Sequence, residues 1–136
     1  MSQDDFGVRL HAIREKVKAL IKQYNITEIV FEDIQLQSSI GNNVDTFKKL
    51  AEVFGIILEL SIDLNIPAIA MHPTSWRSAI SLKGKTRTEQ KKAAQAHVAA
   101  KYNLKVSEDT SDAICIGEAF LRGAIGQLAA DYDWDS

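Results

Sequence analysis

The sequence predicts an α/β fold in which parallel strands are covered by helices. Segments with an apolar residue at every third or fourth position alternate with short apolar runs that are typical of strands. Their order is helix, strand, helix, strand, which indicates βαβ connections and a parallel sheet. The chain has 136 residues, of which 46% are hydrophobic and 25% charged. This size and composition predict one domain over residues 1–130, followed by an acidic tail at 131–136.

The first half of the chain contains two predicted helices and one predicted strand. Apolar positions with helical spacing predict an amphipathic helix over residues 6–24. Residues 27–34 have a continuous apolar centre, which is typical of a parallel strand buried on both faces. A polar loop is expected at 35–43, followed by a helix at about 43–64.

The second half begins with a short apolar segment and is then mostly helical. Thr86 and Glu89 have the spacing of a capping box at the start of one of its helices. The expected elements are a strand at 68–71, helices at 74–81, 88–102 and 110–128, and connecting segments at 82–87 and 103–108.

Composition excludes several classes of protein. The single cysteine, Cys115, excludes a disulfide scaffold, and we expect it to be an inert buried thiol. No apolar run approaches the roughly 20 residues of a membrane helix, and the polar N-terminus does not resemble a signal peptide. We therefore expect a cytoplasmic protein without a membrane partner. The net charge of −2 means that any contact with nucleic acid must be local.

Three carboxylates form the candidate catalytic and metal site. Glu32 follows a buried strand, and ligands of open α/β sheets bind at the carboxyl ends of strands. Asp109 and Asp112 are three residues apart on a predicted helix, so they can share one face. Oxygen ligands of this kind suit Mg²⁺ or Mn²⁺, and a metal pair can clamp the attacking and leaving oxygens of a phosphodiester. The alternative is structural, because acids are also favoured in the first turn of a helix and at a solvated strand end.

A basic segment follows the second strand and is the candidate DNA-binding region. Its Lys83-Gly84-Lys85 motif places two cations around a residue that allows close backbone approach, which suits phosphate oxygens. A solvated helix face and loop is the alternative interpretation. The candidate DNA-binding residues are Arg77, Lys83, Lys85 and Arg87.

Two aromatic residues near this segment have both a structural and a functional interpretation. Trp76 could stack on a base, but a role in the core is favoured. His72 could be a general base or metal ligand, but a hydrogen-bonded histidine at a strand end is favoured.

Three stretches of the chain resemble the RuvC-type Holliday junction resolvases, especially those from phages and prophages of Gram-positive bacteria. They are IVFEDIQLQ at 29–37, HPTSWRSAISLKGKTRTEQKKAA at 72–94 and SEDTSDAICIG at 107–117. They occur in the order of the family, and the resemblance extends from about residue 8 to residue 123.

The resemblance implies a ribonuclease-H-like fold and a homodimer that binds four-way DNA junctions in DNA recombination. It also implies Mg²⁺-dependent nicking of two strands. By position, Glu32 corresponds to the second catalytic acid of the family, and Asp109 and Asp112 correspond to the C-terminal pair. Lys83 and Lys85 would approach the DNA backbone.

The first three strands of the family have no counterpart in this chain, so the resemblance implies an N-terminally truncated form. The first of these strands carries a G-I-D-type motif whose Asp is a metal ligand, and we expect its loss to remove most of the activity. The strand at 27–34 would keep an open edge. We therefore expect self-association or completion by a separate N-terminal piece.

Three functions are compatible with the sequence. The first is a metal-dependent junction endonuclease. The second is a non-catalytic module that binds branched DNA, which requires salt-sensitive affinity but no metal. The third is a protein-interaction adaptor, in which the acids and the basic loop serve only capping and solvation.

Overall fold

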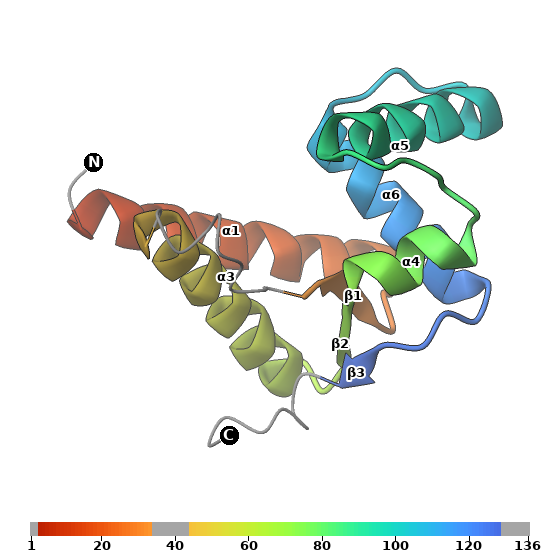
Figure 1. Cartoon of the computed structure of the whole chain (residues 1–136). Coiled ribbons are helices and arrows are strands. Elements are labelled where there is room, and N and C mark those ends of the chain that lie inside the picture. The colour runs from red at the N-terminus through yellow and green to blue at the C-terminus, as the bar shows by residue number, and fades with distance from the viewer. Residues whose placement is uncertain (1–2, 34–43, 129–136) are drawn as a thin grey trace. The chain divides into compact units, whose positions relative to one another are not determined.

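The computed structural model describes residues 3–33 and 44–128 (Figure 1). The chain divides into two compact units. The first unit comprises Met1–Ile29, Ile34–Ala68 and Leu128–Ser136, and the second comprises Val30–Asp33 and Ile69–Gln127. The predicted loop at 35–43 and the tail at 131–136 lie outside the described residues. Within the described part, no helix combines the length and the apolar character needed to cross a membrane.

The first unit is a pair of helices, α1 (Gln3–Tyr24) and α3 (Val44–Asp63), which confirms the helices predicted at 6–24 and 43–64. The two helices pack against one another. Arg14 on α1 joins them, because its Nε lies 2.9 Å from Glu59 Oε2 and its Nη2 lies 3.0 Å from Asp63 Oδ2. The bridge is partly exposed, so packing of the apolar faces contributes most of the stability of the pair.

A small mixed sheet has the strand order β1-β2-β3. β1 (Ile29–Glu32) and β2 (Ala68–Met71) are the two predicted strands. Ile29 N donates to Pro67 O at 2.9 Å and Asp33 N donates to Met71 O at 2.9 Å. Because donor and acceptor advance together along the chain, the two strands are parallel. The expectation that the first strand is buried on both faces is wrong: β1 is half-buried throughout, because it lies at an edge of this sheet.

Three helices complete the second unit: α4 (Pro73–Ala79), α5 (Arg87–Tyr102) and α6 (Glu108–Leu121). The predicted capping box is present, since Glu89 N donates to Thr86 Oγ1 and the Glu89 carboxylate accepts from Thr86 N. The three helices and β2 share one hydrophobic core. The buried members of this core are Met71, Trp76, Ile80, Ala94, Val98, Cys115, Ile116 and Ala119.

The last helix is shorter than predicted, and the strand β3 (Gln127–Leu128) replaces its final turns. Gly123 has φ +95°, a conformation that ends the helix and favours glycine. A Cβ on Gly126 would lie 2.8 Å from the carbonyl oxygen of Ala70, so only glycine allows the chain this close to β2. The apolar spacing beyond residue 121 was therefore misleading, because two glycines redirect the chain to the sheet.

A buried carboxylate joins α5 to α6. The Glu118 side chain is 6% exposed and accepts hydrogen bonds from Lys101 Nζ, from His97 Nε2 at 2.5 Å and from the Tyr102 hydroxyl at 2.9 Å. Burial alone would raise the pKa of Glu118, but the hydrogen bonds from Lys101, His97 and Tyr102 outweigh it and lower the pKa to about 2. The ionised form of Glu118 therefore stabilises the fold.

We predict that Glu118→Gln lowers the free energy of unfolding by about 2 kcal/mol at pH 7, since hydrogen bonds to a charged group are lost. Because the pKa is lowered on folding, this stabilisation is complete above the unfolded value of 4.5 and is lost as the pH falls to about 2. Urea unfolding of both proteins over this pH range measures the difference.

Glu108→Gln is the matched control, because Glu108 is an exposed acid on the same helix. It should change stability by no more than about 0.5 kcal/mol. Equal stability of Glu118→Gln and wild type at pH 7 would contradict this account of the α5–α6 contact.

Candidate active site

Glu32 lies at the end of β1, where a buried indole fixes its position. The carboxylate is half-buried, and its Oε1 accepts a hydrogen bond from Trp76 Nε1 at 3.3 Å. Trp76 is fully buried, which confirms the favoured prediction of a core role. Its ring NH is a donor that needs a partner once it is buried. The same side chain therefore fills the core and orients the candidate catalytic acid.

Asp112 is a buried acid on the second turn of α6. The residue is 7% exposed, and its Oδ2 lies 2.5 Å from Lys91 Nζ on α5. Its other oxygen, Oδ1, is buried and has no hydrogen-bond partner among the described residues. Buried polar atoms are normally paired, and an unpaired carboxylate oxygen is free to accept a donor or bind a cation. Asp112 therefore has the features of a ligand-binding acid.

Asp109 lies one turn earlier on α6 and is exposed. The N-cap of the helix is Ser107, whose hydroxyl accepts from Thr110 N at 3.2 Å, so neither aspartate performs that function. An exposed acid in the first turn is compatible with a favourable interaction with the helix dipole. That explanation fits Asp109 and does not explain why Asp112 is buried.

The three predicted metal ligands do not form a metal-binding group in this structure. Across residues 3–33 and 44–128, no three histidine, cysteine, aspartate or glutamate side chains lie close enough together to hold an ion. Glu32 is bound to Trp76 and Asp112 to Lys91. Of the predicted metal ligands, Asp112 has one carboxylate oxygen, Oδ1, that is unpaired among the described residues and could coordinate a metal ion.

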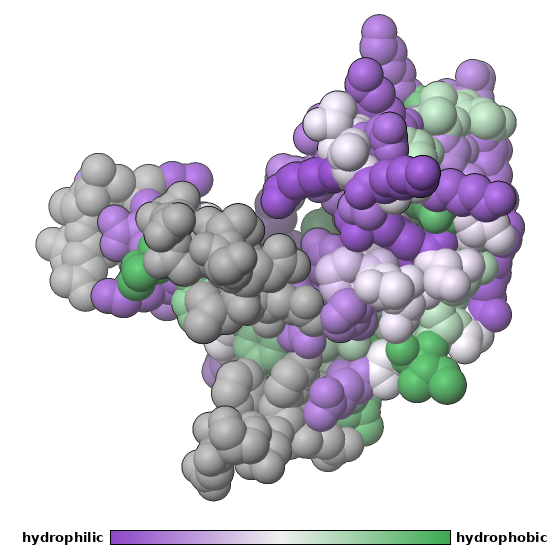
Figure 2. All heavy atoms as spheres, viewed as in Figure 1, coloured by the Kyte–Doolittle hydropathy of each residue, from purple (hydrophilic) through white to green (hydrophobic). Residues whose placement is uncertain are grey.

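The predicted DNA-binding cations lie on α4, on the loop after it and at the start of α5. The guanidinium of Arg77 stacks on the Trp76 ring, 4.6 Å from its centroid. Lys83, Lys85 and Arg87 are exposed. Figure 2 shows hydrophilic side chains gathered over this part of the second unit. The segment therefore presents positive charge to solvent, as a phosphate-binding surface requires.

Lys91 is the residue whose place in the site the sequence analysis missed. Its side chain is 16% exposed, and it is followed at steps of three and four by the buried residues Ala94 and Val98. This spacing places Lys91 on the inner face of α5, which packs on α6. The sequence did contain a sign of this placement, because Lys91 lies three and seven residues before the apolar residues Ala94 and Val98 of the predicted helix.

Two other side chains have structural roles, as favoured from the sequence. His72 is the N-cap of α4, and its Nδ1 accepts from Thr74 N at 3.1 Å. Cys115 is fully buried, and burial raises the pKa of its thiol to about 11.

The model of one protein family matches residues 1–119, and its description is "Crossover junction endodeoxyribonuclease RuvC". The chain belongs to the RuvC family. Members of the RuvC family are generally dependent on divalent metal ions. No curated protein matches the sequence.

Solved structures confirm the RuvC fold. The chain is similar to Thermus thermophilus RuvC in complex with a Holliday junction substrate, with a TM-score of 0.66 and 15% identity over 94% of this chain and 77% of that one. It is also similar to another T. thermophilus RuvC structure, with a TM-score of 0.62 and 14% identity over 94% of this chain and 75% of that one. The predicted ribonuclease-H-like fold is therefore confirmed, and at this identity the match concerns the fold alone.

We predict that Lys91→Met lowers the free energy of unfolding of this RuvC-family chain by about 3–5 kcal/mol, because it leaves the buried Asp112 carboxylate without its counter-charge. The double variant, which combines Lys91→Met with Asp112→Asn, should recover much of the lost free energy of unfolding. Urea unfolding of the two single variants and the double variant measures the coupling between them.

Lys92→Met is the control, since Lys92 is the exposed neighbour on the same helix. It should shift stability by no more than about 0.5 kcal/mol. If Lys91→Met unfolds at the same urea concentration as Lys92→Met, the buried pair does not stabilise the fold.

Proposed function

We propose that this chain is a structure-selective endonuclease that nicks phosphodiesters at four-way DNA junctions. The observation that carries the proposal is Asp112, a buried acid with one oxygen paired to Lys91 and the other unpaired among the described residues. Burying a carboxylate is unfavourable unless its oxygens are paired, and Asp112 Oδ1 has no partner among the described residues. In a chain of the RuvC family, the unpaired oxygen of Asp112 would serve catalysis at a DNA phosphate.

The proposed catalytic residues are Glu32, Asp109 and Asp112, with Mg²⁺ or Mn²⁺ as the cofactor. When bound, the metal supplies charge stabilisation at the phosphodiester. Asp112 would hold it through Oδ1, and Lys91 would keep the Asp112 carboxylate in place through Oδ2. Glu32 is oriented by Trp76, and Asp109 is accessible from solvent.

The proposed partners are a branched DNA and a second copy of the chain. Arg77, Lys83, Lys85 and Arg87 would bind the backbone of the junction, whose phosphates they match in charge. A homodimer would place two such sites on one junction, which symmetric nicking of two strands requires.

A second candidate function is a non-catalytic module that binds branched DNA. It is favoured by the lack of a three-membered metal-binding group among the described residues, and by the lysine that occupies one oxygen of Asp112. This module would use the same basic residues and would bind the junction without cutting it.

A labelled four-way junction separates the two functions. We expect the wild-type chain to produce paired nicks near the crossover in Mg²⁺ or Mn²⁺ and none in a chelator. Asp112→Asn and Glu32→Gln should each reduce the nicking rate by more than the roughly 10–100-fold that loss of an outer-shell group costs. Denaturing gels measure nicking, and native gels measure binding of the same junction.

Glu108→Gln is the control for this assay, because it removes an exposed charge immediately beside Asp109. It should nick at the rate of the wild type. A junction that is retarded on native gels but uncut under all metal conditions would reject the nuclease in favour of the binding module.

A further inference from the structure

The contact between α5 and α6 contains two buried carboxylates, Asp112 and Glu118, which lie six positions apart on α6. Asp112 Oδ2 lies 2.5 Å from Lys91 Nζ. Glu118 Oε2 lies 2.5 Å from His97 Nε2, so the partners on α5 are six positions apart as well. Because the contacts advance together along both helices, α5 and α6 run in the same direction. The two pairs therefore define one register, which is the position of α6 along the axis of α5.

The apolar side chains between these pairs set the register only weakly. Cys115 Sγ lies 4.0 Å from Ala94 O, and this contact has the same offset along the chain as the two carboxylate pairs, 21 positions. Ala94, Cys115 and Ala119 are fully buried, but their side chains are small. Helices fix their relative position by fitting ridges of side chains into grooves, and small side chains form shallow ridges. Polar contacts must therefore contribute to the register, which is a well-attested use of buried charges.

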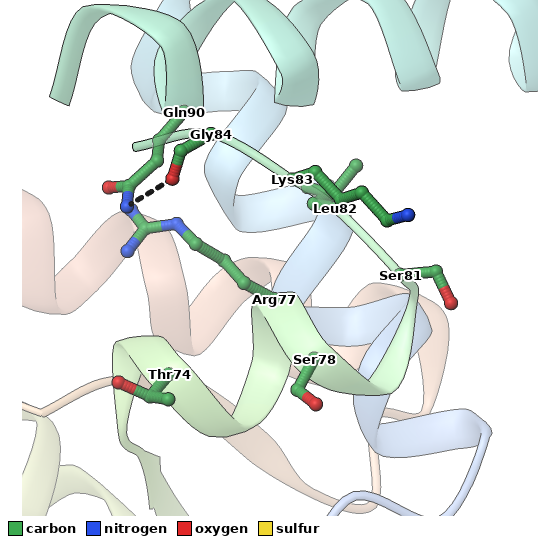
Figure 3. Close-up of a pocket in the computed structure, with 8 residues that line it drawn as sticks. All are labelled: Thr74, Arg77, Ser78, Ser81, Leu82, Lys83, Gly84 and Gln90. Carbon is green, nitrogen blue, oxygen red and sulfur yellow. Dashed lines mark hydrogen bonds between the residues drawn. The ribbon is translucent and has the colours of Figure 1, made fainter. Parts of the chain in front are cut away.

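α5 itself is fixed at its first turns, next to Lys91. Gln90 Nε2 donates to Gly84 O at 3.3 Å (Figure 3). A Cβ on Gly84 would lie 2.8 Å from Gln90 N, so only glycine allows the preceding segment to approach the helix this closely. The capping box of Thr86 and Glu89 holds the same turn. α5 is thus a fixed reference, and a change of register would have to move α6.

Glu118 is held more firmly than Asp112. Three side chains from the last turns of α5 donate to its two oxygens: His97, Lys101 and Tyr102. Asp112 has one hydrogen-bond partner among the described residues, Lys91. The ammonium of a lysine lies on a flexible four-carbon stem, so it can follow the carboxylate when the helix moves. The contacts of Glu118 therefore restrict the position of α6 more than those of Asp112 do.

We propose that Glu118 is a positioning residue, which fixes the register of α6 on α5 and thereby holds Asp112 in place. A slide of α6 by one position would move Asp112 by about 1.5 Å along the helix axis. Ligands of a functional site must be held within about 0.5 Å, so such a slide would disturb it. The register role rests only on the contacts between the two helices, whereas its importance for a metal at Asp112 Oδ1 rests on the proposed function.

Glu118→Leu tests the register. Leucine fills a similar space but accepts no hydrogen bond, and Lys101 and Tyr102 are partly exposed, so they can turn to solvent while the fold is kept. In the ¹³C,¹⁵N-labelled chain, the nuclear Overhauser effect between protons of Cys115 and Ala94 reports the register, and we call it the interhelical signal. The interhelical signal should be lost in Glu118→Leu. Its persistence there would overturn the proposal.

Two control variants separate position from stability. Glu118→Gln keeps the shape of the side chain and its ability to form hydrogen bonds, so it should retain the interhelical signal although it unfolds more easily. Val98→Ala removes volume from the core without changing the polar contacts, and it should retain the signal as well. Loss of the signal in either control would mean that it follows stability and not Glu118, which would contradict the proposal.

A second arm titrates the same chains with Mn²⁺ and follows broadening of the Asp112 amide resonance. Glu118→Leu should weaken Mn²⁺ binding at least about tenfold, as for loss of an outer-shell residue, and the two controls should not. Equal affinity in Glu118→Leu and wild type would show that Glu118 does not position Asp112. If the register changes in Glu118→Leu but Mn²⁺ does not bind at Asp112 in the wild type, the register role stands and the proposed metal site fails.

A double variant, His97→Leu with Tyr102→Phe, replaces Glu118→Leu if that variant does not fold. It keeps Lys101 as the counter-charge and leaves Glu118 with one donor from α5. The interhelical signal should weaken, and the affinity for Mn²⁺ should fall. An unchanged signal in the double variant would reject the positioning role.

Discussion

The structure of the second unit depends on the buried ion pair between Lys91 and Asp112. A charge at this depth is unfavourable unless an opposite charge compensates it, and the pair at 2.5 Å provides that compensation across two helices. Packing of α5 on α6 around Ala94, Val98 and Cys115 brings the two side chains together. Because the lysine pairs with only one carboxylate oxygen, the other oxygen, Oδ1, is left without a hydrogen-bond partner among the described residues.

Trp76 connects the remaining parts of the candidate site. Its indole is buried in the core, its ring NH binds Glu32 at the end of β1, and its face supports the guanidinium of Arg77. One core residue thus positions an acid of the proposed catalytic set and a cation of the proposed DNA-binding set. In the proposed endonuclease this acid and this cation would act on the same strand, and a shared rigid support would keep their separation constant.

The sequence predicted the helices, the two parallel strands and the capping box at Thr86, because these follow from local spacing and turn chemistry. The last helix was predicted to be too long, because the apolar pattern continues past Leu121. Its true end depends on a tertiary contact, the close approach of Gly126 to β2, which the local pattern does not contain. The sequence indicated Asp112 by its spacing from Asp109. It could not show that Asp112 is buried and Asp109 exposed, because this difference depends on how α6 packs on α5. The same packing explains why the pairing of Lys91 with Asp112 could not be predicted.

The most direct test of this account is to locate Mn²⁺ on the chain in complex with a four-way DNA junction, by paramagnetic broadening of its amide resonances. The account predicts broadening centred on Glu32 and on residues 109–115, lost in Asp112→Asn and retained in Glu108→Gln. Broadening centred elsewhere, or unchanged in Asp112→Asn, would contradict the claim that Asp112 is the metal-binding acid of a junction nuclease.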